Sequence, residues 1–303
     1  MKKQYRWTAS DIPDQTGRIA VVTGASAGLG FEAVLQLAKK KATVIMAIRS
    51  IERGQRALDR ILKCVPDAKL SLQLLDLGSL DSVKKAAKEI KAKHKKLDIL
   101  INNAGTFMEK GQTKDGFESR FGVNHLGHFA FTLCLLDTIM ATPASRIVNV
   151  SSVVHHRKNL ANFDDLKTPI KKTFKAYGRS KLAGLLFTYE LQRRLQGTNT
   201  IAVAAHPGIS YSEITRYFPR AVVWLSKLVM QSTSQGALPI LRAATDPSVL
   251  GGQFYGPHKR KQRSGWPKVV TSSQQSYNID LQKHLWTVSE ELTGIKWETR
   301  PNS

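Results

Sequence analysis

Short apolar segments recur along this chain, and stretches with helical periodicity separate them. The segments are rich in Val, Ile and Leu, which is typical of strands buried on both faces. Alternation of such strands with helices predicts an α/β fold, a doubly wound parallel sheet with helices on both faces. We expect the strands at Ile19–Thr23, Thr43–Ile48, Ser71–Leu75, Ile99–Asn102, Arg146–Val150 and Ile201–His206.

The length of the chain suits one large α/β domain or two small ones. Of the 303 residues, 42% are hydrophobic, which is enough to bury a substantial core. No internal repeat or long linker divides the chain, so we expect a single domain over residues 1–303. Cys64 and Cys134 stand far apart and in no metal-ligand spacing. We therefore expect two free, buried thiols and no metal site.

A glycine-rich turn, Thr23-Gly24-Ala25-Ser26-Ala27-Gly28-Leu29-Gly30, follows the first expected strand and opens the next helix. Glycine lets the backbone approach a pyrophosphate closely, and the N-terminus of a helix attracts the negative charge of the phosphates. Between a strand and a helix, such a turn predicts a dinucleotide site. The architecture is then of the Rossmann type, in which ligands bind beyond the carboxyl ends of the strands.

Residues at the ends of the next three expected strands extend this prediction. Arg49 ends the second strand, where an acidic residue usually binds the ribose of NAD and a basic residue accommodates the 2′-phosphate of NADP. NADP(H) is therefore favoured over NAD(H). Asp76, beside Leu77, is a candidate acceptor for adenine, with a helix cap as the alternative. The small residues of Asn102-Asn103-Ala104-Gly105 let the chain pass close beneath a cofactor.

Tyr177 and Lys181 stand four residues apart in the run Tyr177-Gly178-Arg179-Ser180-Lys181. Four residues make about one helical turn, so the phenol and the ammonium project from the same face. A neighbouring cation favours the phenolate, and we expect it to lower the pKa of Tyr177 toward neutrality. The pair predicts a general acid/base that exchanges a proton with a substrate oxygen beside the cofactor.

Together these motifs resemble the classical short-chain dehydrogenases/reductases over about residues 15–260. The matching elements are Thr23–Gly30, Asn102–Gly105, Ser151-Ser152, Tyr177–Lys181 and Pro207-Gly208. The segments Trp7–Pro13 and Leu285–Gly294 resemble more narrowly the retinol-dehydrogenase-like branch, particularly its soluble bacterial members.

The resemblance implies hydride transfer between NADP(H) and an alcohol or carbonyl compound. Tyr177 is then the catalytic acid/base, Lys181 holds the nicotinamide ribose and lowers the pKa of Tyr177, and Ser152 binds the substrate oxygen. Asn124 supports a water relay behind the lysine. The implied cofactor-binding residues are Gly24, Ser26, Ala27, Gly28, Leu29, Gly30, Arg49, Asp76, Leu77, Asn103, Ala104, Gly105, Tyr177, Lys181, Pro207, Gly208, Ile209 and Ser212.

The sequence departs from the family pattern at two places near the substrate. The interval from Ser152 to Tyr177 is longer than in the family core and holds His155-His156. We expect these to be exposed loop histidines, with a place at the substrate mouth as the alternative. Ser212 is the nearest equivalent of a family threonine that contacts the nicotinamide carboxamide.

The resemblance also divides the chain into parts. A cofactor-binding part covers about 15–150, a catalytic part about 151–208, a small embedded substrate lobe about 209–240 and a C-terminal extension about 251–303. The apolar stretch Ala221–Met230 in the lobe favours an apolar small-molecule substrate: a retinoid, a long-chain aldehyde or a sterol-like ketone. Family members are commonly dimers or tetramers, which implies a homo-oligomer.

The net charge of +23 attracts anions but does not identify them. No helix-turn-helix, zinc-finger or RNA-recognition signature accompanies it, so we expect no nucleic-acid partner. The N-terminus lacks the apolar core of a signal peptide, and we expect a cytoplasmic protein. Peripheral contact with a membrane stays open. A catalytically silent NADP(H)-binding sensor and a membrane-surface protein are the alternative functions.

Overall fold

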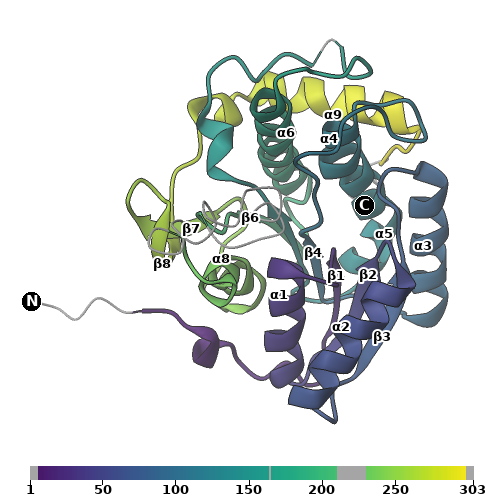
Figure 1. The fold of residues 1–303 in the computed structure, drawn as a ribbon, viewed down its shortest axis with the longest axis vertical. Helices are drawn as coiled ribbons and strands as arrows, with labels where there is room; N and C mark the ends of the chain where they lie inside the picture. The colour runs from purple at the N-terminus through teal and green to yellow at the C-terminus, as the bar shows by residue number, and fades with distance from the viewer. Residues whose placement is uncertain (1–5, 164, 210–229, 298–303) are drawn as a thin grey trace, which may run out of the picture.

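Eight strands form one sheet in the computed structural model, which describes residues 6–163, 165–209 and 230–297 (Figure 1). Their order is β3-β2-β1-β4-β5-β6-β7-β8. The strands are β1 Ile19–Thr23, β2 Thr43–Ile48, β3 Leu70–Leu74, β4 Ile99–Asn102, β5 Arg146–Val150, β6 Ile201–Ala205, β7 Phe254–Lys259 and β8 Ser264–Val269.

The first seven strands run parallel, and β8 pairs antiparallel with β7. Strand order reverses direction between β1 and β4, which lie side by side although β2 and β3 separate them in the chain. This is the switch point at which open α/β sheets bind ligands. The predicted doubly wound parallel sheet is confirmed.

Two of the predicted strands need corrected bounds. β3 begins and ends one residue earlier than expected, and β6 ends at Ala205. Two strands, β7 and β8, were not expected at all. Both contain glycine and proline, which weaken the sequence signal of a strand, and proline is tolerated mainly at edges such as the β7–β8 ribbon.

Helices cover both faces of the sheet (Figure 1). Side-chain caps define several of their starts: Ser50 accepts the N–H of Arg53 at α2, and Ser79 accepts that of Ser82 at α3. The helices are α1 Gly28–Lys39, α2 Ile51–Cys64, α3 Leu80–Lys93, α4 Ser119–Phe121, α5 Gly127–Met140, α6 Thr173–Arg194, α8 Thr233–Thr245 and α9 Ile279–Thr293. A π-helical turn, Gly122–Leu126, joins α4 to α5. None of the helices described is long and apolar enough to cross a membrane.

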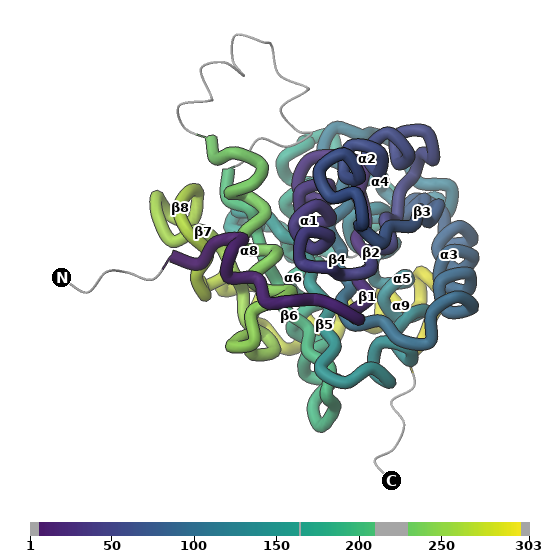
Figure 2. Tube along the Cα trace, turned by 90° about the horizontal axis from the view of Figure 1, so that it is seen from below, coloured from purple at the N-terminus to yellow at the C-terminus, as the bar shows by residue number. Residues whose placement is uncertain are grey.

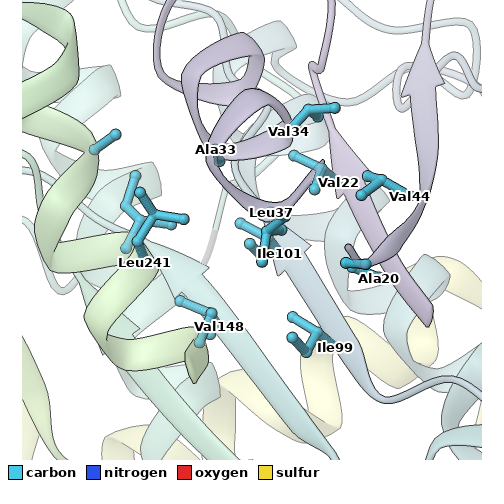
Figure 3. Close-up of a cluster of buried hydrophobic side chains, with 14 of the residues drawn as sticks. Ala20, Val22, Ala33, Val34, Leu37, Val44, Ile99, Ile101, Val148 and Leu241 are labelled. Atoms are coloured by element: carbon cyan, nitrogen blue, oxygen red, sulfur yellow. The ribbon is translucent and has the colours of Figure 1, made fainter. Parts of the chain in front are cut away.

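Alternate side chains of the strands belong to two separate apolar layers, one on each face of the sheet. Val22 of β1 packs with α1 and α8, whereas Val21 packs with α3, α5 and α6. Figure 3 shows the first layer, where Leu37 of α1 and Leu241 of α8 cover Ile101 and Val148 of the sheet. Two-sided burial explains why the strands read as continuous apolar runs.

Two outlying segments close this core. The N-terminal arm buries Trp7 and Ile12 in the layer formed with α1 and α8, and Figure 2 shows the arm crossing α8. At the other end of the described chain, α9 packs on α6 and places Trp286 against Phe129 and Phe187.

Both cysteines are free, but the expected burial is wrong: Cys134 is half-buried and Cys64 is exposed. Cys64 departs further from the expectation. It is the last residue of α2, beyond the positions Gly54, Ala57 and Ile61 that face the sheet. The C-terminal end of the helix therefore leaves the thiol in solvent.

Candidate active site

The glycine-rich turn after β1 forms a close-fitting backbone cradle. Gly24 has a φ of +68°, and a Cβ there would lie 2.9 Å from the Cα of Ala104. A Cβ on Gly30 would lie 2.3 Å from the carbonyl oxygen of Gly24. No side chain caps α1, because Ala27 occupies its N-cap, so the first N–H groups are left for an anion. The cradle fits a pyrophosphate.

Thr23 ties this turn to the end of β4. Its hydroxyl oxygen accepts the N–H groups of Asn103 and Ala104, both at 2.9 Å, and the Asn103 amide donates to the Thr23 carbonyl oxygen at 2.9 Å. His128 Nε2 lies 2.9 Å from the same hydroxyl. Sequence reasoning missed His128, because one histidine in an apolar helix carries no local signal.

The side chains expected at the adenosine end lie on the same edge of the sheet. Arg49 is exposed, with an ion pair of 3.5 Å to Glu109. Asp76 is not the cap of α3. Its Oδ1 accepts the N–H of Gly78 at 3.0 Å, and Lys114 lies 3.6 Å from its Oδ2. Leu77 is buried.

Ser152, Tyr177 and Lys181 meet at the carboxyl end of β5. Ser152 lies close enough to the Tyr177 phenol for its side chain to act to lower the pKa of Tyr177. Lys181 Nζ donates to the Val150 carbonyl oxygen at 2.9 Å and lies 5.6 Å from the centre of the Tyr177 ring. Ser151 instead donates to the carbonyl oxygen of Lys181 at 3.0 Å. The second serine of the pair is therefore the one that faces the tyrosine.

The pKa of Tyr177 moves in the opposite direction to the expectation. Burial raises it to about 12, and Ser152 opposes that shift only in part. Burial also lowers the pKa of Lys181 to about 8. The sequence argument counted the nearby cation and not the loss of water around both groups. Burial is the largest cause of both shifts, and the rise in the pKa of Tyr177 is opposed by Ser152 rather than by the lysine.

Asn124 lies in the π-helical turn and is held on three sides. Its Oδ1 accepts the N–H of Thr106 at 2.7 Å, and its Nδ2 donates to the Thr106 carbonyl oxygen at 3.0 Å and to Ser180 Oγ at 2.9 Å. A Cβ on Gly105 would lie 3.2 Å from Asn124 Oδ1 and 3.5 Å from Lys181 Nζ, so glycine leaves room for both groups.

A small polar cavity of about 10 Å³ lies behind Lys181, about the size of one water molecule. Its lining combines Asn124 and Ser180 with amides from two strands. The lining residues are Asn102, Asn124, His125, His128, Asn149, Val150, Ser180, Lys181, Gly184 and Phe187.

The Pro207-Gly208 turn follows β6 at the same edge. Gly208 has a φ of +71°, and the N–H of Ile209 donates to the Arg263 carbonyl oxygen at 2.9 Å. Ser212 and most of the apolar stretch Ala221–Met230 lie outside the described residues.

The two loop histidines differ from each other. His156 is exposed as expected, but His155 is fully buried, which contradicts the expectation. A short 3-10 helix, Val153–His156, turns the His155 ring inward, where Nδ1 lies 2.5 Å from the Ser152 carbonyl oxygen and the ring packs edge-on against Phe254.

Aromatic side chains that sequence reasoning missed border Tyr177. The Phe107 ring meets the Tyr177 ring edge-on at 5.0 Å, and Phe174 meets Phe107 at the same distance. Phe107 is buried, whereas 46% of Phe174 is exposed. The signal for Phe107 was its position two residues after the Asn102–Gly105 run. The site thus has an apolar border on its tyrosine side.

Comparisons with known proteins agree with this geometry. Residues 18–222 match the family model described as short chain dehydrogenase. Retinol dehydrogenase 12 of Mus musculus is 40% identical over 289 residues, which cover 93% of this chain and 88% of that protein. Its counterpart of the same name in Homo sapiens is 37% identical over 290 residues, with the same shares covered.

Solved structures share the architecture. An uncharacterised protein from Mycobacterium paratuberculosis has a TM-score of 0.79 at 36% identity, covering 97% of this chain and 100% of that one. The NADP complex of RhlG from Pseudomonas aeruginosa has a TM-score of 0.64 at 25% identity, covering 79% and 94%. With the family model matching most of its length, the chain belongs to the short-chain dehydrogenase family, oxidoreductases that act on CH–OH groups of small molecules.

Proposed function

We propose that this protein is an NADP(H)-dependent oxidoreductase that interconverts an apolar alcohol and its carbonyl compound. The observation that carries the proposal is the grouping of Ser152 and Tyr177, with Lys181 one turn along the same helix, beside a backbone cradle that fits a pyrophosphate.

Ser152 and Tyr177 handle the substrate oxygen and its proton. Ser152 holds the oxygen by a hydrogen bond, and Tyr177 gives a proton to it during reduction or takes one during oxidation. The bound nicotinamide supplies or accepts the hydride. Lys181 holds the nicotinamide ribose, and Asn124 together with the cavity behind Lys181 relays a proton to Tyr177 during reduction and away from it during oxidation.

Arg49 supports NADP(H) as the cofactor. Its guanidinium is exposed at the end of β2, where it is free to pair with a 2′-phosphate, and no acidic residue occupies this position. The structural relative RhlG is known in complex with NADP. Asp76, Leu77, Asn103 and Ile209 complete the proposed contacts, and Ser212 adds one from outside the described residues.

The substrate is proposed to be a retinoid, a long-chain aldehyde or a sterol-like ketone. The names of the relatives support a retinoid, and the apolar border of Phe107 and Phe174 beside Tyr177 supports the wider class.

The remaining parts of the proposal concern organisation. We propose that the chain is divided into cofactor-binding, catalytic, substrate and C-terminal parts. We also propose that the protein is a homo-oligomer and is cytoplasmic. Sedimentation of the protein alone tests the homo-oligomer. Sedimentation with anionic vesicles tests whether the protein contacts a membrane surface.

The testing experiment follows oxidation of NADPH and, in parallel, NADH against a panel of apolar aldehydes and ketones. We expect turnover with NADPH that falls about 100-fold or more in Tyr177→Phe, because the variant keeps the ring and lacks the proton. Cofactor binding without turnover across the panel would favour the silent sensor instead. Equal turnover by Tyr177→Phe would contradict the assignment of the acid/base.

A further inference from the structure

The turn between β7 and β8 has an unusual backbone. Arg260, Lys261 and Gln262 have φ values of 51°, 54° and 62°, three consecutive non-glycine residues in the left-handed region. L-residues other than glycine disfavour this region, and such a conformation persists only where surrounding contacts fix it. The turn belongs to the basic run Lys259–Arg263, in which Gln262 is the uncharged residue.

Gln262 connects this turn to a buried histidine. Its Oε1 accepts a hydrogen bond from His206 Nε2 at 3.0 Å, and its Nε2 donates to the Thr271 carbonyl oxygen at 2.8 Å. His206 is fully buried, and a Cβ on Gly256 would lie 2.2 Å from its Nε2. Gly256 therefore leaves the space in which the His206 ring lies.

His206 passes the connection on to the turn after β6. Its Nδ1 accepts the N–H of Gly208 at 3.2 Å, which places the ring proton on Nε2, where Gln262 accepts it. One tautomer thus satisfies both nitrogens. The bonds run without interruption from Gln262 through His206 to Gly208.

Gln231 holds the same turn from a second direction. Its Nε2 donates to the Pro207 carbonyl oxygen at 3.1 Å, and its Oε1 accepts the N–H of Gly265 in β8 at 2.7 Å. A Cβ on Gly208 would lie 2.6 Å from the Arg263 carbonyl oxygen. The hairpin and the Pro207-Gly208 turn are therefore in direct contact.

We infer that the β7–β8 turn positions Pro207-Gly208 against the nicotinamide end of the cofactor, with Gln262 as the positioning residue. The inference rests on the proposed function, in which Pro207-Gly208 contacts NADP(H). It gives a reason for the left-handed backbone: that conformation directs the Gln262 amide to His206 and Thr271 at once.

Two matched variants separate the side chain from the backbone. Gln262→Gly and Lys261→Gly each place glycine at a left-handed position, and only Gln262→Gly removes the bond to His206. Each variant is titrated with NADPH and with 2′,5′-ADP, a fragment that lacks nicotinamide. Gln262→Asn, which tolerates the left-handed region but is one methylene shorter, repeats the measurement should the glycine variant unfold.

We expect Gln262→Gly to raise the dissociation constant of NADPH about fivefold. This change corresponds to the net free energy of one buried neutral hydrogen bond. Binding of 2′,5′-ADP by this variant, and of both ligands by Lys261→Gly, should match the wild type. Unchanged NADPH binding by Gln262→Gly, or an equal weakening of NADPH and 2′,5′-ADP binding, would overturn this inference and leave the proposed function standing. A wild type that binds neither ligand would overturn the proposed function and the inference with it.

Discussion

Cofactor choice rests on one exposed residue in the proposed function. Arg49 lies at the end of β2, and among the residues that the structure describes it pairs with the exposed Glu109, at 3.5 Å. Such a pair contributes little to stability, because solvent screens it. Its guanidinium is therefore free to exchange Glu109 for a phosphate.

Replacing Arg49 by alanine should raise the KM for NADPH about tenfold and leave the KM for NADH within twofold, because a charge-assisted bond to the 2′-phosphate is lost. Steady-state kinetics with both cofactors measure the effect. Lys63→Ala, which removes an equal charge from the far end of α2, is the control. A parallel rise for NADH would mean that Arg49 does not distinguish the two cofactors.

At the residue scale, spacing predicted proximity better than it predicted chemistry. Tyr177 and Lys181 were expected on one helical face, and the structure brings them together with Ser152. The pKa of Tyr177 was predicted in the wrong direction, and His155 was expected in solvent. Both errors have one cause: burial depends on distant segments such as Phe254, which local sequence does not reveal.

At the scale of elements, a hydrogen bond joins α9 to the π-helical turn of the candidate active site. Ser289 Oγ lies 2.9 Å from His125 Nε2 and donates to the Leu285 carbonyl oxygen at 2.7 Å, so it accepts the proton of the histidine. His125 stands next to Asn124 in the π-helical turn. Turns of this kind occur often at functional sites, and here the last described helix supports one.

Ser289→Ala should lower the free energy of unfolding by about 1–3 kcal/mol, because it leaves the buried N–H of His125 without an acceptor. The variant should also lower kcat by a larger factor than it changes KM, since the residue next to Asn124, His125, loses its hydrogen bond to α9. Urea unfolding and steady-state kinetics measure the two effects.

Thr287→Ala, an exposed change on the same helix, is the matched control and should alter neither quantity. A loss of stability without any loss of kcat would leave α9 a purely structural element.

The sequence predicted the strand and helix on either side of the glycine-rich turn, and it missed the β7–β8 ribbon. The turn after β1 combines a strand, glycines and a helix within a short segment, so local pattern was sufficient. The β7–β8 ribbon depends on pairing of Tyr255 with Val269 and on contacts with β6, and its glycines and prolines conceal the strand pattern.

At the scale of the whole molecule, four histidines are buried in the neutral form. Burial lowers the pKa of His125, His128 and His206 to about 3 and that of His155 to about 4, from 6.5. Below pH 6.5 the unfolded chain binds protons that the folded protein excludes. Stability contributed by these residues is therefore present above that pH and lost as the pH falls toward 4.

Urea unfolding between pH 7 and pH 5 should show this loss. Each histidine contributes a slope of about 1.4 kcal/mol per pH unit once the pH is well below its unfolded pKa. The unfolding free energy should fall steeply from pH 6 to pH 5. A value that stays constant over this interval would show that the buried histidines are charged in the folded protein.

The position of α9 in the chain has a consequence for biosynthesis. Trp286 and Leu285 complete two core clusters built on α5 and α6, yet α9 follows every other described helix and strand. A ribosome therefore releases the glycine-rich turn after β1 and the helix that carries Tyr177 and Lys181 before their apolar cover is made. Until α9 emerges, we expect the nascent chain to lack the cover of Phe129, Phe187 and Leu186, which favours association with neighbouring chains.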